Sequence, residues 1–127
     1  MMKKVAGFTM IELLIVLAIL ATLLTIAAPR YFSSVDRAKE SALRQNLFVL
    51  RDAIDKFHSD NGEYPEELAV LVDKRYIRFI PEDPFTRTTD SWILIRPAGA
   101  DTDSKEIYDI KSGATGTSTK GDPYGNW

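Results

Sequence analysis

One uninterrupted apolar block near the N-terminus constrains this chain more than any other feature. Residues 8–28 are apolar except for three threonines and one glutamate: Thr9, Glu12, Thr22 and Thr25. As an α-helix, this block spans about 30 Å, the thickness of the hydrocarbon core of a bilayer. The basic residues Lys3 and Lys4 precede it, and the positive-inside rule keeps such residues in the cytoplasm. We therefore expect residues 8–28 to cross a membrane and the following residues to lie beyond it.

Glu12 is the residue that a plain anchor does not explain. A carboxylate at the centre of a bilayer costs about 2.5–3.5 kcal/mol, and such a residue usually has a functional partner. A cut between Gly7 and Phe8 would place a new amino group one helical turn before Glu12, within one chain or between adjacent chains. The alternatives are a protonated or headgroup-reaching Glu12, or a secretory signal cut near residues 25–27, although the apolar run of such signals is usually only roughly 7–15 residues.

A helical pattern continues beyond the apolar block. Pro29 is expected to remove one backbone hydrogen bond and to bend the helix axis. Apolar residues then recur mainly at steps of three and four, which predicts an amphipathic helix with one apolar stripe. The stripe consists of Val35, Ala38, Ala42, Leu43, Leu47, Leu50, Ile54 and Phe57. With Gly62 as the C-cap, residues 8 to about 60 predict one bent helix about 80 Å long.

Residues 62–127 predict a small mixed region. The expected elements are a short helix within 66–74, a strand at 92–96, a turn at 98–104, a strand at 106–111 and a third short strand near 124–127. The two longer strands form an antiparallel hairpin. Because a two-stranded hairpin is only marginally stable alone, it is expected to pack on the amphipathic helix. The predicted fold class is α+β, with a long, bent N-terminal helix packed on a small antiparallel sheet.

Composition and motifs favour a protein that is not an enzyme. The chain has 16 Lys and Arg against 18 Asp and Glu, one His and no Cys. This charge balance gives no reason to expect a nucleic-acid partner. The lack of cysteine excludes disulfides, thiolate metal sites and Cys nucleophiles. Residues 113–120 contain the ingredients of a phosphate-binding loop at the wrong spacing, and acidic pairs such as Glu66–Glu67 are expected to be solvated.

The segment from Gly7 to Leu17, GFTMIELLIVL, resembles the class III signal of type IV pilins and type II secretion pseudopilins. The resemblance implies that a prepilin peptidase cuts after Gly7 and methylates the amine of Phe8. It also implies that Glu12 pairs with the Phe8 amine of a neighbouring subunit and sets the stagger of a helical filament. The implied parts are a cleaved leader at 1–7, a transmembrane and filament-core half at 8–28, an amphipathic half at 29–61 and a globular region at 62–127.

Four further segments resemble the major, G-type pseudopilins of type II secretion and their relatives in sibling systems: Tyr64–Pro65, Asp83–Thr86, Ile107–Gly113 and Asp122–Trp127. The lack of cysteine agrees with this branch, because many type IV pilins close a C-terminal loop with a disulfide. The resemblance implies a structural subunit of a periplasmic pseudopilus, anchored in the inner membrane by a single span. Its implied partners are other copies of itself, prepilin peptidase, minor pseudopilins and an inner-membrane assembly platform.

Two other functions stay open at this point. One is a type IV pilin of a surface pilus, and the other is a membrane-anchored periplasmic scaffold that never polymerises. Replacement of Glu12 separates the filament subunits from the scaffold, because a filament subunit should still be inserted and cut but should fail to assemble.

Calcium is the one cofactor that the resemblance suggests. Major pseudopilins often bind one calcium ion in the C-terminal loop through carboxylates and backbone carbonyls, and calcium takes about six to eight oxygen ligands. Here Thr115 stands where that loop commonly has an aspartate, which leaves Asp122 as the candidate ligand. The alternative is a loop held by backbone hydrogen bonds, with Tyr124 and Trp127 packed beneath it.

Overall fold

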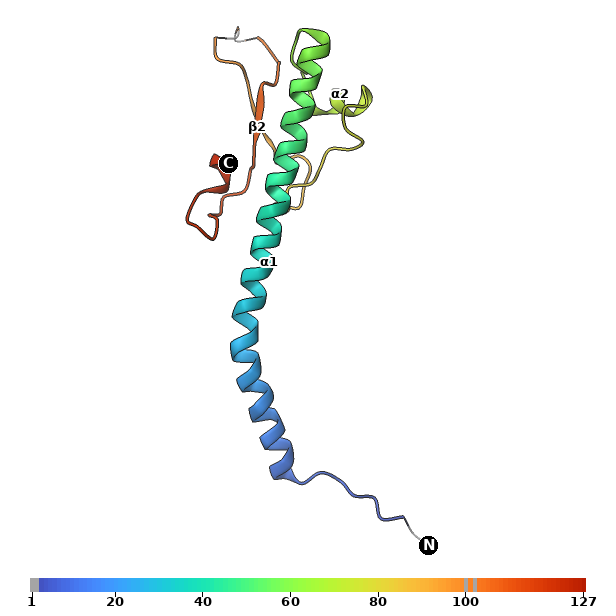
Figure 1. Ribbon diagram of the computed structural model, residues 1–127, viewed down its shortest axis with the longest axis vertical. Coiled ribbons are helices and arrows are strands. Elements are labelled where there is room, and N and C mark those ends of the chain that lie inside the picture. The colour runs from blue at the N-terminus through green and yellow to red at the C-terminus, as the bar shows by residue number, and fades with distance from the viewer. Residues whose placement is uncertain (1–2, 100, 102) are drawn as a thin grey trace. The chain divides into compact units, whose positions relative to one another are not determined.

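A long helix and a mostly irregular C-terminal region make up this protein. The computed structural model describes residues 3–99, 101 and 103–127. Its elements are α1 (Met10–Asn61), α2 (Leu68–Asp73), β1 (Ile93–Ile95), β2 (Asp109–Lys111) and the 3₁₀ helix η1 (Tyr124–Asn126) (Figure 1). The chain divides into two compact units, Met1–Val35 and Asp36–Trp127, and α1 contributes to both.

In the first unit, α1 keeps its apolar side chains on the surface. From Met10 to Ile26 every large apolar residue is exposed, from 49% at Val16 to 82% at Met10. The hydroxyls of Thr22 and Thr25 donate to the carbonyls of residues 18 and 21, each at 2.8 Å, so they need no water. Within the described residues, α1 is the one helix long and apolar enough to cross a membrane. The helix continues through Pro29, and the bend there stays a prediction.

In the second unit, one face of α1 forms the core with the C-terminal region. The buried residues are Leu43, Leu47, Leu50, Ala53, Ile54 and Phe57 of α1, with Leu68, Leu71, Trp92, Ile107, Ile110 and Tyr124. This confirms the predicted stripe from Leu43 onward. It was wrong at Ala38 and Ala42, which are exposed. No described part of the C-terminal region covers these two, whereas Glu40 between them is buried.

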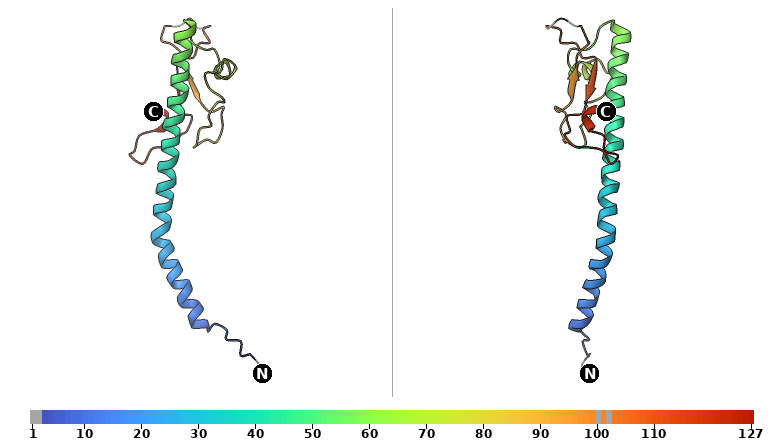
Figure 2. Two further views of the ribbon diagram at one scale, coloured as in Figure 1. Left: turned by 45° about the vertical axis from the view of Figure 1, so that its right-hand side comes forward. Right: turned by 90° about the vertical axis from the view of Figure 1, so that its left-hand side faces the viewer.

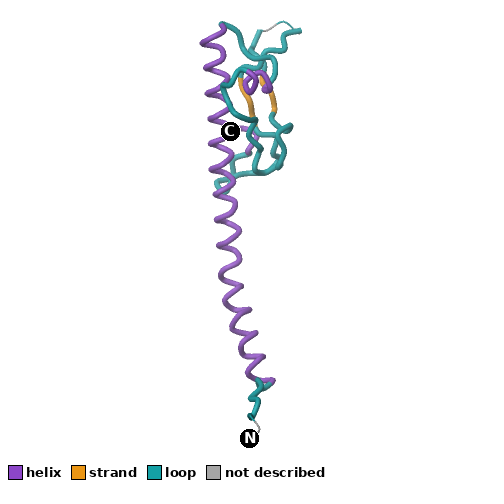
Figure 3. Tube along the Cα trace, turned by 90° about the vertical axis from the view of Figure 1, so that its right-hand side faces the viewer, coloured by secondary structure: helices purple, strands orange, loops and turns teal. Residues whose placement is uncertain are grey.

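The helix ends where the sequence predicted. Gly62 has a φ of +75°, and its N–H donates to the carbonyl of His58 at 2.8 Å, which is the left-handed C-cap that glycine favours. The short second helix is also present, as α2. Loops make up most of the rest of this unit (Figure 3).

The predicted antiparallel pairing is confirmed, but the strands are shorter. Ile93, Leu94 and Ile95 pair with Lys111, Ile110 and Asp109, and both strands lie beside α1 (Figure 2). The second strand does not begin at 106, because the N–H of Ile107 donates to the carbonyl of Pro65 instead. Of the predicted turn at 98–104, residues 100 and 102 lie outside the described residues, as do residues 1 and 2 of the predicted leader.

The third predicted strand was wrong. Residues 124–126 form η1, and an isolated bridge joins Thr117 to Pro123. Proline has no N–H to continue a ladder, and the N–H of Asn126 donates back to the carbonyl of Pro123 at 3.1 Å. This tight turn lets the Tyr124 side chain enter the core, where it is only 5% exposed.

Candidate functional site

The expected cleavage site lies immediately before α1 in chain without regular structure. Gly7 and Phe8 are both exposed, Phe8 to 89%. Residues 3–9 have no helix or strand hydrogen-bonding pattern. The peptide bond after Gly7 is therefore open to a protease without prior unwinding of α1.

Glu12 has hydrogen-bond partners in the uncut chain. The N–H of Thr9 donates to Glu12 Oε2 at 2.9 Å, and the N–H of Glu12 donates to Thr9 Oγ1 at 3.2 Å. This is a capping box, in which the residue before a helix and the third helical residue satisfy each other's N–H groups. It also places a carboxylate at the positive end of the helix dipole.

Sequence reasoning missed this capping box, although the spacing Thr-x-x-Glu at 9–12 is its signature. The carboxylate therefore has a backbone hydrogen-bond partner before any cleavage, the N–H of Thr9. Among the described residues, no hydrogen bond reaches the second oxygen, Glu12 Oε1. One oxygen caps the helix, and the other is open to a further donor.

A second polar cluster lies within the second unit, where α1 meets the C-terminal segment (residues 112–127). Glu40 is 8% exposed although it carries a carboxylate. Its Oε1 accepts the N–H of Thr119 at 2.7 Å and the hydroxyl of Tyr124 at 3.0 Å. Its Oε2 accepts the hydroxyl of Thr119 at 3.2 Å. We call these three residues the Glu40 cluster.

The ionisation states in the Glu40 cluster follow from these contacts. Burial raises the pKa of Glu40, but the hydrogen bonds from Thr119 and Tyr124 and the charge of Arg44 together bring that pKa below its ordinary value. For Tyr124, burial first and then the adjacent Glu40 carboxylate raise the pKa to about 12. At neutral pH an anion therefore faces a neutral phenol that donates to it.

Glu40 also escaped the sequence interpretation, which gave it no role. The signal that could have found it is its place on the buried stripe. It lies three residues before Leu43 and seven before Leu47, spacings that share one helix face.

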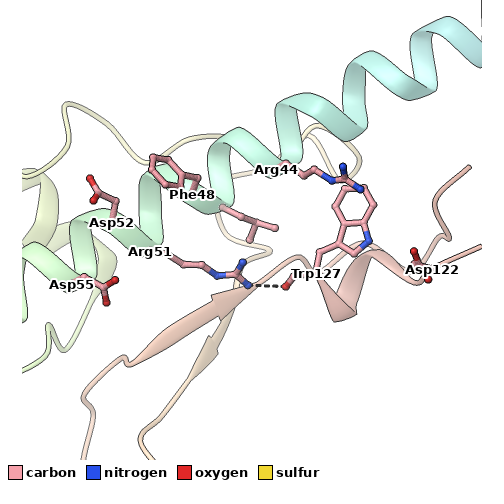
Figure 4. A pocket seen from close by; sticks show the side chains of 8 residues that line it. Arg44, Phe48, Arg51, Asp52, Asp55, Asp122 and Trp127 are labelled. Carbon is pink, nitrogen blue, oxygen red and sulfur yellow. Dashed lines mark hydrogen bonds between the residues drawn. The ribbon is translucent and has the colours of Figure 1, made fainter. Parts of the chain in front are cut away.

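Two arginines of α1 hold the end of the C-terminal segment. The guanidinium of Arg44 lies 4.4 Å from the centre of the Trp127 ring. Arg51 donates to Asp109 Oδ1 at 2.8 Å and to the carbonyl of Ile110 at 2.9 Å. It also donates to the carbonyl of Trp127 at 2.7 Å, the bond drawn in Figure 4. Such multiple bonding by a planar guanidinium fixes geometry more tightly than a single ion pair.

Asp83 ties a further loop to the same region. Its side chain is fully buried and accepts the hydroxyl of Ser112 at 2.5 Å and the N–H of Phe85 at 2.9 Å. The Phe85 ring in turn stacks on Tyr124, with ring centres 4.1 Å apart. The motif at 83–86 thus has a structural role beneath the C-terminal segment.

The structure does not bring other carboxylates together around Asp122, the candidate calcium ligand. Asp122 is exposed and lines a groove of about 570 Å³ that Asp52, Asp55, Arg44 and Trp127 also line. In Figure 4 the two α1 aspartates lie at the opposite end of this groove from Asp122. No cluster of three His, Asp or Glu suited to a metal occurs among the residues that the structure describes.

Comparisons with known proteins agree with the N-terminal motif, and they also find proteins that are similar along nearly the whole chain. The model of the prokaryotic N-terminal methylation motif matches residues 2–28. The chain is 27% identical to type II secretion system core protein G of Klebsiella michiganensis, across 95% of this chain and 92% of that protein. It is 26% identical to the protein of the same name from Klebsiella pneumoniae, across 99% and 96%. It is 25% identical to the protein of the same name from Escherichia coli K12, across 98% of this chain and 92% of that protein.

No solved structure matches the chain. The chain thus carries a prokaryotic N-terminal methylation motif and is similar, along nearly its whole length, to type II secretion system core protein G.

Proposed function

We propose that this protein is the major subunit of a periplasmic pseudopilus that drives type II protein secretion. One observation carries the proposal: the apolar half of α1 is exposed along its length and lies within the matched N-terminal methylation motif, residues 2–28. In lipid, helices have no hydrophobic drive to associate, so this half can reside in the membrane before assembly. Packed against other copies, the same surface forms the core of a filament.

The proposed processing begins with a cut between Gly7 and Phe8 by prepilin peptidase, followed by methylation of the Phe8 amine. Residues 1–7 are then the leader, and residues 8–28 the membrane-spanning and filament-core half. The bend at Pro29 separates this half from the amphipathic residues 29–61, and residues 62–127 form the periplasmic region.

Glu12 is proposed to link neighbouring subunits. Its Oε1 would accept a hydrogen bond from the methylated ammonium group of Phe8 in the next subunit, while Oε2 keeps the capping bond from the N–H of Thr9. The two roles are compatible because they use different oxygens of one carboxylate. Repeated contacts between different surfaces of identical subunits give an open helix instead of a closed ring, which suits a filament.

The proposed role is structural and not catalytic. The subunit is anchored in the inner membrane, with its C-terminal region in the periplasm. Its partners are further copies of itself, prepilin peptidase, minor pseudopilins and the inner-membrane assembly platform. Nucleic acid is not among them, since the chain has 16 basic and 18 acidic residues.

The first test is the intact mass of the protein purified from cells, which should equal residues 8–127 plus one methyl group. The second is Glu12→Ala, compared with the matched control Glu63→Ala, an exposed glutamate just beyond α1. Glu12→Ala should be inserted and cut normally but should yield almost no filament, whereas Glu63→Ala should assemble.

Two outcomes would favour the other functions. If the wild type forms no filament and Glu12→Ala functions in cells as well as the wild type does, the result would favour a membrane-anchored scaffold. Surface fibres without any secretion defect on deletion of the protein would favour a type IV pilin of a surface pilus.

A further inference from the structure

The C-terminal segment points hydrogen-bond donors, not acceptors, at Glu40 of α1. The groups that converge on Glu40 are the N–H and the hydroxyl of Thr119 and the hydroxyl of Tyr124. A loop that holds calcium must present carboxylates and carbonyl oxygens to the cation. Here the charge at the centre of the loop contacts is negative and comes from the helix.

Three backbone oxygens of the segment accept hydrogen bonds from within the segment. The carbonyl of Gly116 accepts the N–H of Tyr124 at 3.1 Å, and the carbonyl of Asp122 accepts the N–H of Ser118 at 2.7 Å. The carbonyl of Ser118 accepts the N–H of Gly121 at 2.9 Å, and Ser118 Oγ accepts the N–H groups of Lys120 and Asp122. The turn is closed by its own hydrogen bonds, without a cation.

The packing around the Tyr124 ring also supports the hydrogen bond from its hydroxyl to Glu40. The ring stacks on Phe85 and meets Trp127 edge-on. At Gly116, a Cβ would lie 3.2 Å from the Tyr124 ring, so the lack of a side chain lets the ring approach the backbone. This fixes the Tyr124 hydroxyl within reach of Glu40.

We propose that the Glu40 carboxylate takes the place of a metal ion in this protein and closes the C-terminal segment onto α1 without calcium. Each of its three bonds is made to a charged acceptor, the stronger class of protein hydrogen bond. The proposal concerns the fold of one subunit and does not depend on the proposed function.

The test measures trypsin cleavage after Lys120, an exposed residue inside the segment, on the full-length protein in detergent micelles. Product masses identify this cut among the others. Wild-type protein should be cleaved there at the same rate in EDTA and in millimolar calcium. Glu40→Ala should be cleaved at least about tenfold faster, as expected from loss of hydrogen bonds to a charged group, and equally fast with or without calcium.

Two further variants keep the test interpretable. Asp55→Asn changes an exposed carboxylate of the same helix and should leave the cleavage rate unchanged. Tyr124→Phe keeps the ring and its stacking but removes one bond to Glu40, so it should increase the rate by less than Glu40→Ala. It also serves as the test if Glu40→Ala does not fold.

Slower cleavage of the wild type in calcium than in EDTA would overturn the proposal, because it would reveal a metal site. Unchanged cleavage in both Glu40→Ala and Tyr124→Phe would also overturn it. Since the protein is unassembled in this assay, neither result bears on filament formation.

Discussion

The two parts of α1, one in each unit, carry the same kinds of apolar side chain but differ in whether these side chains are exposed or buried. Between residues 10 and 26 the large apolar side chains stay exposed, for example Leu17 at 53%, whereas Leu43, Leu50 and Ile54 in the second part are completely buried. The C-terminal region supplies a partner for the second part. An apolar helix surface left without a partner in its own unit indicates that lipid or another molecule covers it.

The two glutamates of α1 repeat this contrast. Glu12 bonds to Thr9, within its own helical turn. Glu40 bonds to residues 79 and 84 positions away along the chain. The first carboxylate organises local structure at a helix end, and the second joins distant parts of the chain.

The largest effect that tests this contrast is expected from matched leucine substitutions. Leu50→Ala should lower the free energy of unfolding of the C-terminal region by about 2–5 kcal/mol, because it leaves a cavity in a packed core. Leu17→Ala should leave it unchanged, because this side chain has no core around it. Thermal unfolding in detergent, followed by near-ultraviolet circular dichroism, measures both. Equal effects of the two would show that the first part of α1 also packs within the chain.

A smaller effect is expected from acid, through Glu40. Its pKa is lower in the folded than in the unfolded protein, so its ionisation stabilises the fold above the ordinary value of 4.5. This stabilisation is lost as the pH falls through the lower, folded-state pKa. The charged or titratable groups nearby are Arg44, Tyr124 and, acting on Tyr124, Asp36.

The measurement compares the melting temperatures of the wild type and Glu40→Gln from pH 7 to pH 3. The advantage of the wild type should be constant near neutrality and should shrink as the carboxylate is protonated. A difference that is independent of pH would assign the role of Glu40 to packing instead of charge.

The smallest effect is expected at the surface of the second part of α1. Lys56 and Asp52 form an ion pair of 2.8 Å, but their side chains are 65% and 42% exposed, and exposed pairs contribute little. Lys56→Ala should therefore leave the melting temperature unchanged within error. Arg51→Ala is the contrasting variant and should lower it, because Arg51 also bonds the carbonyls of Ile110 and Trp127. A large loss with Lys56→Ala would contradict this ranking.

Much of the fold could be predicted because it depends on local patterns. The apolar block and the stripe from Leu43 to Phe57 follow from helical periodicity, and Gly62 ends α1 because glycine tolerates a positive φ. The pairing of β1 with β2 was also predictable from two apolar runs separated by a turn. The methylation motif at residues 2–28 is local in the same way.

The C-terminal segment could not be predicted in this manner. Whether residues 124–127 form a strand or a 3₁₀ turn depends on where the Tyr124 ring is buried, and that depends on Phe85 and α1. Burial of Glu40 depends on donors that the chain brings back only after 79 further residues. Periodicity can place Glu40 on a face, but it does not say which groups will cover that face.

The sequence by itself determined the long helix, its two kinds of surface and the processing motif, because these depend on the order of neighbouring residues. Only the tertiary structure decided that Glu40, Arg44 and Arg51 hold the C-terminal segment and that, among the described residues, no cluster of three acidic or histidine side chains forms around Asp122. The physical reason is that hydrogen bonds to a buried charge require donors at fixed positions in space, and folding of the whole unit sets those positions.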